Sequence, residues 1–357
     1  MERLGLVGLP NAGKSALYNA LTGQGALVAP HPFSTTETSV GVARVPDHRL
    51  GDLARLSASR KVVAATVEVV DIAGLVAGSA SGEGLGNRFL AGIREVDAIA
   101  LVLRAFASDA VPGGSDPLDD LRTLELELVL ADLASAEAQL AKRRKMARQD
   151  RGEAGAVEVL ELAVAALAEG TPLYRSTLGD DERQALKPMF LLTNKPVLAV
   201  VNLGEDQVGD AGATKAVVDE LAGTAEVLAV SVQLEAEAAR LDPADRRELL
   251  EGLGLGEGVL PRVAAVAYRM LGRRTFFTTG EDESRAWTVR AGARAPECAG
   301  AIHSDLQRGF IKAEVVHWSE LVELGSWAAA RDAGRLRIEG KDYEVIDGDV
   351  LEIRFNV

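Results

Sequence analysis

Near its start the chain reads Leu4-Gly5-Leu6-Val7-Gly8-Leu9-Pro10-Asn11-Ala12-Gly13-Lys14-Ser15, and this stretch decides the fold. An apolar run enters the pattern G-x-x-x-x-G-K-S, and residues that suit a helix follow it. A strand, this loop and a helix in that order form a phosphate-binding loop, or P-loop. The stretch therefore predicts an α/β nucleotide-binding domain of the P-loop type.

Each part of the loop has an expected role. Gly8 and Gly13 let the backbone turn its N–H groups towards phosphate oxygens, and the start of the following helix adds partial positive charge. Lys14 is expected to reach the β- and γ-phosphates, and the Ser15 hydroxyl is expected to ligate Mg²⁺. The residues expected to contact the nucleotide here are Asn11, Ala12, Gly13, Lys14, Ser15 and Ala16.

The composition of the 357-residue chain narrows the class of protein. Its net charge is −14, so any contact with nucleic acid must come from a local basic patch. Hydrophobic residues make up 47 %, which supports packed cores, but no apolar run reaches the roughly 20 residues of a membrane span. The single cysteine, Cys298, excludes an intramolecular disulfide. We expect a cytoplasmic protein with no membrane contact.

Short apolar runs predict the strands of a mainly parallel sheet. They lie at residues 66–70, 98–103, 196–201 and 226–230. Runs of this kind are typical of strands that are buried on both faces, and helical patterns separate them. Helices are also predicted at residues 243–253 and 258–271.

A helical period interrupts these strands from residue 118 onwards. One segment repeats leucine and alanine at spacings of four and three, and the second, after the polar stretch 142–155, does the same. The pattern predicts two long antiparallel helices that form an inserted coiled-coil hairpin. The residues expected to face its seam are Leu126, Leu130, Leu133, Ala136 and Leu140 in the first helix and Val157, Leu160, Val164 and Leu167 in the second.

The chain becomes rich in strand signals again from residue 275. Strands are predicted around 276–277, 287–289, 335–338, 343–346 and 350–355, with short helices at 304–309 and 318–324. The predicted domains are a nucleotide-binding domain of residues 1–117 and 186–273, a helical insertion of residues 118–185, and a compact β-rich domain of residues 274–357.

Two further motifs are expected beside the phosphates. Asp71-Ile72-Ala73-Gly74 follows a predicted strand, where Asp71 can hold Mg²⁺ and the Gly74 N–H can sense the γ-phosphate. Thr35, in the loop before the second strand, can add its hydroxyl to the metal. Leu75 follows Gly74, where many GTPases have a glutamine that orients the attacking water, so slow intrinsic hydrolysis is expected. The candidate catalytic residues are Lys14, Gly74 and Leu75.

The base-binding motif of a guanine-specific domain, N-K-x-D, is altered in this chain. Asn194-Lys195-Pro196-Val197 lacks the aspartate and precedes a strand instead of following it. The correct place holds Asn202-Leu203-Gly204-Glu205, where glutamate replaces aspartate and leucine replaces lysine. Adenine becomes plausible as the base. Backbone groups of Ser231 and Val232, at the end of the next strand, are expected to approach it.

With these motifs placed, the chain resembles the YchF-type P-loop ATPases of the Obg superfamily over nearly its whole length. The resemblance implies a nucleotide-binding G domain, an inserted helical hairpin and a C-terminal TGS domain of the β-grasp type. It also implies ATP preferred over GTP, Leu203 beside the adenine, and Mg²⁺ held by Ser15 and Thr35. The segments that carry it are residues 8–15, 32–35, 71–76, 82–87, 202–205 and 285–288, and the terminal Phe355-Asn356-Val357.

Three positions refine what the resemblance implies. Asn11 matches an asparagine that helps to hold K⁺ in related potassium-activated GTPases, so a K⁺ effect is an analogy. Ser34 stands where many relatives have a cysteine before the switch threonine, which removes redox control through that thiol. Residues 107–117 contain no histidine, although bacterial relatives often have one there that is suspected of helping hydrolysis. The group that positions the attacking water is therefore left open.

The predicted hairpin tip is rich in cations. It can meet RNA phosphates, or it can be a solvated helix end whose cations complement the helix dipole. The resemblance to a ribosome-associated family favours RNA, with the TGS domain as a possible second contact. We expect a monomer. The tip cations are Lys142, Arg143, Arg144, Lys145, Arg148 and Arg151.

Three functions remain in competition at this point. The first is a Mg²⁺-dependent ATPase that acts on the translation machinery. The second is a slow GTP switch with the same fold. The third is a ribosome- or RNA-binding module in which the nucleotide is mainly structural, which Leu75 and the missing histidine favour.

Overall fold

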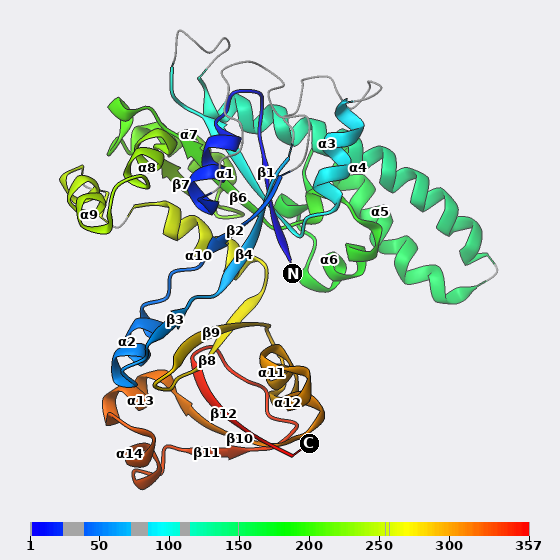
Figure 1. Cartoon of the computed structure of the whole chain (residues 1–357). Coiled ribbons are helices and arrows are strands. Elements are labelled where there is room, and N and C mark those ends of the chain that lie inside the picture. Colours follow the sequence, from blue (N-terminus) through cyan, green and yellow to red (C-terminus); the bar gives the residue numbers. More distant parts are fainter. Residues whose placement is uncertain are drawn as a thin grey trace. The chain divides into compact units, whose positions relative to one another are not determined.

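A computed structural model describes residues 2–23, 39–72, 85–107, 115–148, 150–253, 255–256 and 258–356 (Figure 1). Contacts divide the chain into two compact units. The first consists of Met1–Ala43 and Glu68–Val263, and the second of Arg44–Val67 and Ala264–Val357. The chain therefore leaves the first unit between Ala43 and Arg44 and returns to it at Glu68.

The first unit is built on a six-stranded sheet in the order β2-β4-β1-β5-β6-β7. Strands β4, β1, β5, β6 and β7 run parallel to one another. The predicted α/β fold with a mainly parallel sheet is thereby confirmed. The strands are β1 Arg3–Val7, β2 Ser39–Arg44, β4 Thr66–Asp71, β5 Ala98–Arg104, β6 Val197–Asn202 and β7 Glu226–Val230.

Two of the inner strands, β5 and β6, are buried along their whole length. Every residue of β5 and of β6 is buried, as expected for parallel strands that are covered on both faces. The helices of this unit outside the hairpin are α1 Lys14–Thr22, α3 Leu85–Arg94, α7 Gly212–Leu221, α8 Val232–Ala238 and α9 Pro243–Gly252, and α10 Leu260–Met270 begins here but belongs mostly to the second unit. A 3-10 turn, η6 Glu205–Gln207, follows β6.

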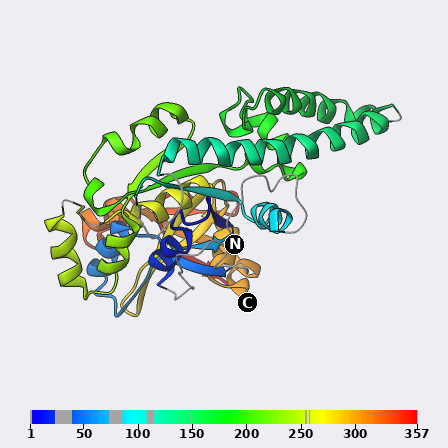
Figure 2. The same ribbon diagram turned by 90° about the horizontal axis from the view of Figure 1, so that it is seen from above.

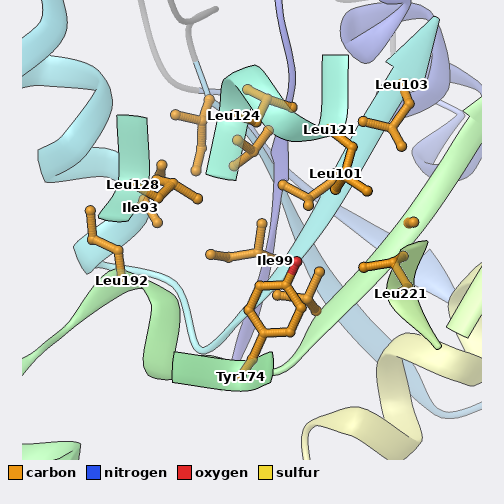
Figure 3. Packing of buried hydrophobic residues seen from close by; sticks show 14 of the residues in the cluster. Ile93, Ile99, Leu101, Leu103, Leu121, Leu124, Leu128, Tyr174, Leu192 and Leu221 are labelled. Carbon is orange, nitrogen blue, oxygen red and sulfur yellow. The ribbon is translucent and has the colours of Figure 1, made fainter. Parts of the chain in front are cut away.

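The hairpin begins inside the core of this unit. Its first helix, α4 Pro117–Ala147, packs its early turns on β5, where Leu121, Leu124 and Leu128 lie near Ile99 and Leu101 (Figure 3). The second helix, α5 Ala154–Ala168, runs beside the later turns of α4 (Figure 2). The remaining elements here are η2 Arg151–Glu153, η3 Leu173–Arg175, α6 Asp180–Leu186, η4 Lys187–Met189 and η5 Leu192–Asn194.

The face that α4 buries differs in part from the predicted seam. Ala136 and Leu140 are buried against α5 and Leu133 is partly buried, but Leu126 and Leu130 are 56 % and 47 % exposed. The prediction was wrong at these two leucines because the early turns of α4 face β5, whereas the later turns face α5. On α5, Leu160 and Leu167 are buried, and Val157 and Val164 pack partly against the same cluster.

The second unit holds a six-stranded sheet in the order β11-β10-β12-β8-β9-β3. Residues 44–67 belong to it, since β3 pairs in parallel with β9, so they separate from the nucleotide-binding domain in which the sequence placed them. The elements are α2 His48–Leu56, β3 Lys61–Val63, β8 Arg273–Thr278, β9 Glu283–Arg290, α11 Ala295–Ile302, α12 Ser304–Arg308, β10 Phe310–His317, α13 Trp318–Leu324, α14 Trp327–Asp332, β11 Arg337–Glu339 and β12 Asp349–Phe355.

The prediction for this unit missed one strand and placed another strand wrongly. Strand β10, which pairs with both β11 and β12, was missed. The strand predicted at residues 343–346 is irregular backbone with one isolated bridge, Arg294 to Glu344. Its shape follows from the buried carboxylate of Asp349, which accepts hydrogen bonds from the Tyr343 hydroxyl at 2.7 Å and the Ile346 N–H at 3.1 Å.

Candidate nucleotide-binding site

The loop between β1 and α1 has the backbone that its glycines predict. Asn11 and Gly13 have φ values of 63° and 96°, in the left-handed region. A Cβ atom at Gly8 would lie 2.5 Å from the carbonyl oxygen of Val102, and one at Gly13 would lie 2.3 Å from Nδ2 of Asn202. Only glycine fits these two positions, because both side-chain sites are already filled.

Lys14 is held inside the loop. Its Nζ donates hydrogen bonds to the carbonyl oxygens of Gly8 at 3.0 Å and Leu9 at 2.9 Å. Burial lowers the pKa of this lysine to about 8, although the nearby carboxylates of Asp71 and Asp120 act in the opposite direction. The ammonium group is thus placed where the loop would hold phosphates, with little water around it.

Ser15 and Asp71 lie together at the ends of α1 and β4. The Ser15 hydroxyl donates to Oδ2 of Asp71 at 2.6 Å. Asp71 is 1 % exposed, and its Oδ1 is buried without a hydrogen-bond partner in the described part of the chain. Burial raises the pKa of this carboxyl group. A buried carboxylate oxygen without a partner, next to a hydroxyl, fits a hard cation such as Mg²⁺, which takes one or two protein oxygens and completes its shell with phosphate and water.

Asn202 joins three parts of the candidate site. Its Nδ2 donates to the carbonyl oxygen of Ala12 at 3.0 Å, and its Oδ1 accepts from the N–H of Val232 at 3.2 Å. Ser231 lies beside it with a buried hydroxyl that has no partner among the described residues. The asparagine predicted to bind the base therefore also fixes the P-loop to the start of α8.

Leu203 and Glu205 differ in their surroundings. The Leu203 side chain is buried in the hydrophobic core of the unit, and its N–H donates to the carbonyl oxygen of Val230 at 2.8 Å. Leu203 can therefore line a base site through its backbone, and its side chain packs inwards. Glu205 is exposed at the start of η6.

Sequence reasoning missed Gln207, which also contacts this loop. Its Oε1 accepts from the N–H of Gly204 at 2.8 Å, and its Nε2 donates to the carbonyl oxygen of Ala105 at 3.1 Å. No motif marks a glutamine at this position. Its second partner lies in the segment after β5, far away in the sequence.

The other predicted site residues divide into two groups. Thr35, Gly74 and Leu75 lie outside the described residues. The alternative motif at residues 194–197 has structural contacts instead: the Asn194 amide donates to the carbonyl oxygen of Arg183 at 2.9 Å, and Lys195 donates to backbone carbonyls before β5. This motif precedes β6, as predicted.

The hairpin tip is less uniformly cationic than its sequence. Arg143 pairs with Glu153 at 2.5 Å, and Arg144 pairs with Glu161 at 2.7 Å. The cations that are exposed and have no ion-pair partner in the described part of the tip are Lys142, Lys145 and Arg148.

None of the helices in the described part of the chain combines the length and the apolar character that a membrane span requires.

Comparisons with known proteins show which family the chain resembles. A family model described as a 50S ribosome-binding GTPase matches residues 3–128, and a model of the C-terminal region of YchF GTPases, described as a protein of unknown function, matches residues 274–356.

Several relatives match over nearly their whole length. The "Ribosome-binding ATPase YchF" of Bacillus subtilis is 44 % identical over 361 residues, which cover 99 % of both chains, and that of Escherichia coli O157:H7 is 40 % identical with the same coverage. The structure of the Schizosaccharomyces pombe YchF GTPase superposes with a TM-score of 0.86 at 31 % identity, over 99 % of this chain and 97 % of that one. Because full-length relatives share so much of the sequence, the chain belongs to the YchF family.

Proposed function

We propose that this chain is a Mg²⁺-dependent nucleoside triphosphatase that hydrolyses ATP in preference to GTP and acts as a regulatory switch on the ribosome. One observation carries the proposal: at the start of α1, next to Lys14, the Ser15 hydroxyl donates to Oδ2 of buried Asp71, whose Oδ1 has no partner among the described residues. The bacterial relatives are named ribosome-binding ATPases, which is the same activity.

The residues of the P-loop have separate roles in binding the phosphates and the metal. Backbone N–H groups from Asn11 to Ala16 surround the phosphates, and the Lys14 ammonium leaves the carbonyl oxygens that hold it to offset charge on the β- and γ-phosphates. Ser15 and Asp71 would hold Mg²⁺, with Thr35 as the expected third ligand, and the metal would supply positive charge to offset that of the phosphates.

The preference for ATP rests on the loop after β6. Guanine has two hydrogen-bond donors, N1–H and the 2-amino group, and the aspartate of N-K-x-D normally accepts from both. Adenine has neither donor at these positions. Here Glu205 is exposed and one methylene longer than aspartate, and the Leu203 side chain is turned into the core. A slow GTP switch is the alternative, because Asn202 is compatible with either base.

The attacking water needs a group other than the Leu75 side chain. We propose that the ribosome, a bound K⁺ ion or a backbone group positions it. The candidate for K⁺ is Asn11, which matches the asparagine of related potassium-activated GTPases and has a left-handed backbone in the P-loop. Replacing KCl with NaCl in a hydrolysis assay tests this role directly.

Ribosome contact is assigned to the hairpin tip, with the C-terminal TGS domain as a second contact. Arg143 and Arg144 are largely neutralised by their glutamate partners, which leaves Lys142, Lys145 and Arg148 to meet RNA phosphates. A protein with this partner acts in the cytoplasm, and we propose that it does so as a monomer.

The test is an equilibrium titration of nucleotide-free protein with fluorescent ATP and GTP analogues in Mg²⁺, with unlabelled competitors. We expect ATP to bind at least tenfold more tightly, which is about 1.4 kcal/mol, and Lys14→Ala to abolish binding of both. Tighter GTP binding would make the protein a GTP switch. Binding of neither nucleotide, with ribosome binding intact, would leave the RNA-binding module.

A further inference from the structure

The loop after β6 is tied to the segment after β5 through one residue, Ala105. Its N–H donates to the carbonyl oxygen of Asn202 at 2.9 Å, and its carbonyl oxygen accepts from Nε2 of Gln207 at 3.1 Å. Ala105 is buried and Gln207 is half-buried, so water has limited access to the two backbone groups of Ala105. Both backbone groups of this residue are therefore committed to the base loop, which we define as residues 202–207.

Gln207 closes the base loop on itself as well. Its Oε1 accepts from the N–H of Gly204 at 2.8 Å, and its own N–H donates to the carbonyl oxygen of Gly204 at 3.1 Å. A Cβ atom at Gly204 would lie 2.6 Å from Oδ1 of Asp206 in the same turn and 3.5 Å from Cβ of Phe106, so the turn lies within van der Waals range of the segment after β5. One amide group thus fixes the turn and attaches it to the segment that follows β5.

We infer that Gln207 is a positioning residue for the base, and that the preference between ATP and GTP depends on its bond to Ala105. The inference rests on the proposed function, in which residues 202–205 read the base. Asn202 and Leu203 are held by β6 and the core, but Gly204 and Glu205 lie beyond the strand and have Gln207 as their link to the sheet. Selectivity between two purines requires donors and acceptors in fixed positions, so a loosened turn binds both bases more equally.

A simpler role for Gln207 is to cap the first turn of η6 through the Gly204 N–H. Such a cap needs the side-chain oxygen alone. The bond from Nε2 to Ala105 adds nothing to a cap, because it reaches the separate segment that follows β5. Gln207→Glu separates the two roles, since a carboxylate still accepts from Gly204 but cannot donate to Ala105.

The experiment measures dissociation constants for non-hydrolysable ATP and GTP analogues in the wild-type chain, Gln207→Glu and Gln207→Ala. Any effect of the new charge on the phosphates falls equally on both nucleotides, so the ratio of the two constants isolates base selectivity. The matched control is Gln139→Ala, which removes a half-buried glutamine whose Nε2 also donates to a carbonyl oxygen, that of Met189 at 3.2 Å, within the hairpin.

We expect both Gln207 variants to lower the ATP-to-GTP preference about fivefold, the contribution of one neutral hydrogen bond, and Gln139→Ala to leave it unchanged. An unchanged preference in Gln207→Glu overturns the inference and leaves the proposed ATP preference standing. An equal loss in Gln139→Ala also overturns it, because the effect would then be general destabilisation. A wild-type chain with no ATP preference removes the proposed function itself. If Gln207→Ala fails to fold, Gln207→Glu still decides.

Discussion

The two ends of helix α4 are built in opposite ways. At its base, Glu125 is buried and accepts from the Tyr174 hydroxyl and from Arg175 at 2.8 Å, and Arg175 also bonds to Glu220 of α7. At its tip, the cations are exposed except for the half-buried Arg143, and Arg143 and Arg144 pair with glutamates of the hairpin itself. One end of α4 is thus held by buried hydrogen bonds and ion pairs, and the other end presents charged side chains to solvent.

The difference separates an end of α4 that is fixed by buried contacts from an end whose proposed role is to bind a partner. Buried charged groups are kept only where partners satisfy them, so the network at the base fixes α4 to η3 and α7 of the nucleotide-binding unit. Exposed lysines without partners contribute little to stability and remain free to meet a ligand. The base is therefore expected to respond to mutation through stability, and the tip through binding.

The largest expected effect follows from removing the carboxylate at the base. Glu125→Ala leaves Arg175 and the Tyr174 hydroxyl without their acceptor, so we expect the free energy of unfolding to fall by about 3 kcal/mol. The measurement is urea denaturation followed by circular dichroism. The matched control at the tip is Glu161→Ala, which breaks an exposed pair with Arg144 and should cost less than about 0.5 kcal/mol. Equal losses at the two positions would contradict the comparison.

The second effect concerns binding at the tip. Replacing Lys142, Lys145 and Arg148 together by alanine removes three charges that face solvent. We expect ribosome affinity to fall about tenfold at moderate salt, and the slope of log affinity against log salt to become shallower by about 2. Sedimentation with purified ribosomes at several KCl concentrations measures both quantities.

The control for this triple variant lies at the base of the same helix. Arg122 is also an exposed cation, but it pairs with Glu220 at 2.9 Å. Arg122→Ala should leave the salt slope unchanged, and the triple variant should keep its free energy of unfolding within about 0.5 kcal/mol. A salt slope that Arg122→Ala alters as much as the triple variant would mean that the tip has no special role.

Much of the nucleotide site could be predicted from the sequence because its signals are local. The glycines around Lys14 and the asparagine that ends β6 mark their own backbone requirements, and the structure brings Ser15, Asp71 and Asn202 to the same ends of the parallel strands. The roles of Thr35, Gly74 and Leu75 stay predictions.

Features that depend on distant partners could not be predicted in this way. Gln207 was missed because its partner Ala105 is about a hundred residues away in the sequence. Lys61–Val63 joins the C-terminal sheet by pairing with β9, which is also far away in the sequence. Leu126 and Leu130 fit a helical period as well as the buried residues do, but which face is buried depends on whether β5 or α5 lies opposite. Periodicity finds the helix, and the neighbouring element selects its face.

The smallest effect is expected where α4 starts, at Asp120. Its Oδ2 accepts from the N–H of Arg104 at 2.9 Å, and burial raises the pKa of this carboxyl group. Asp120→Asn keeps an oxygen that can accept this bond and removes the charge, so the free energy of unfolding should change by less than about 1 kcal/mol at neutral pH. Asp120→Ala leaves the Arg104 N–H without a partner and should cost more.

The stability difference between Asp120→Asn and the wild type should depend on pH. Because the pKa of Asp120 is higher in the folded than in the unfolded chain, the folded state binds this proton more tightly. Its contribution to stability is therefore greatest in acid and is lost as the pH rises from about 4, the unfolded value, through the folded pKa. Asp120→Asn lacks this titration, so its stability relative to the wild type should rise over that window in urea denaturation at several pH values. A relative stability that falls over the same window would show that hydrogen bonds and nearby cations, and not burial, dominate the charge at this end of α4.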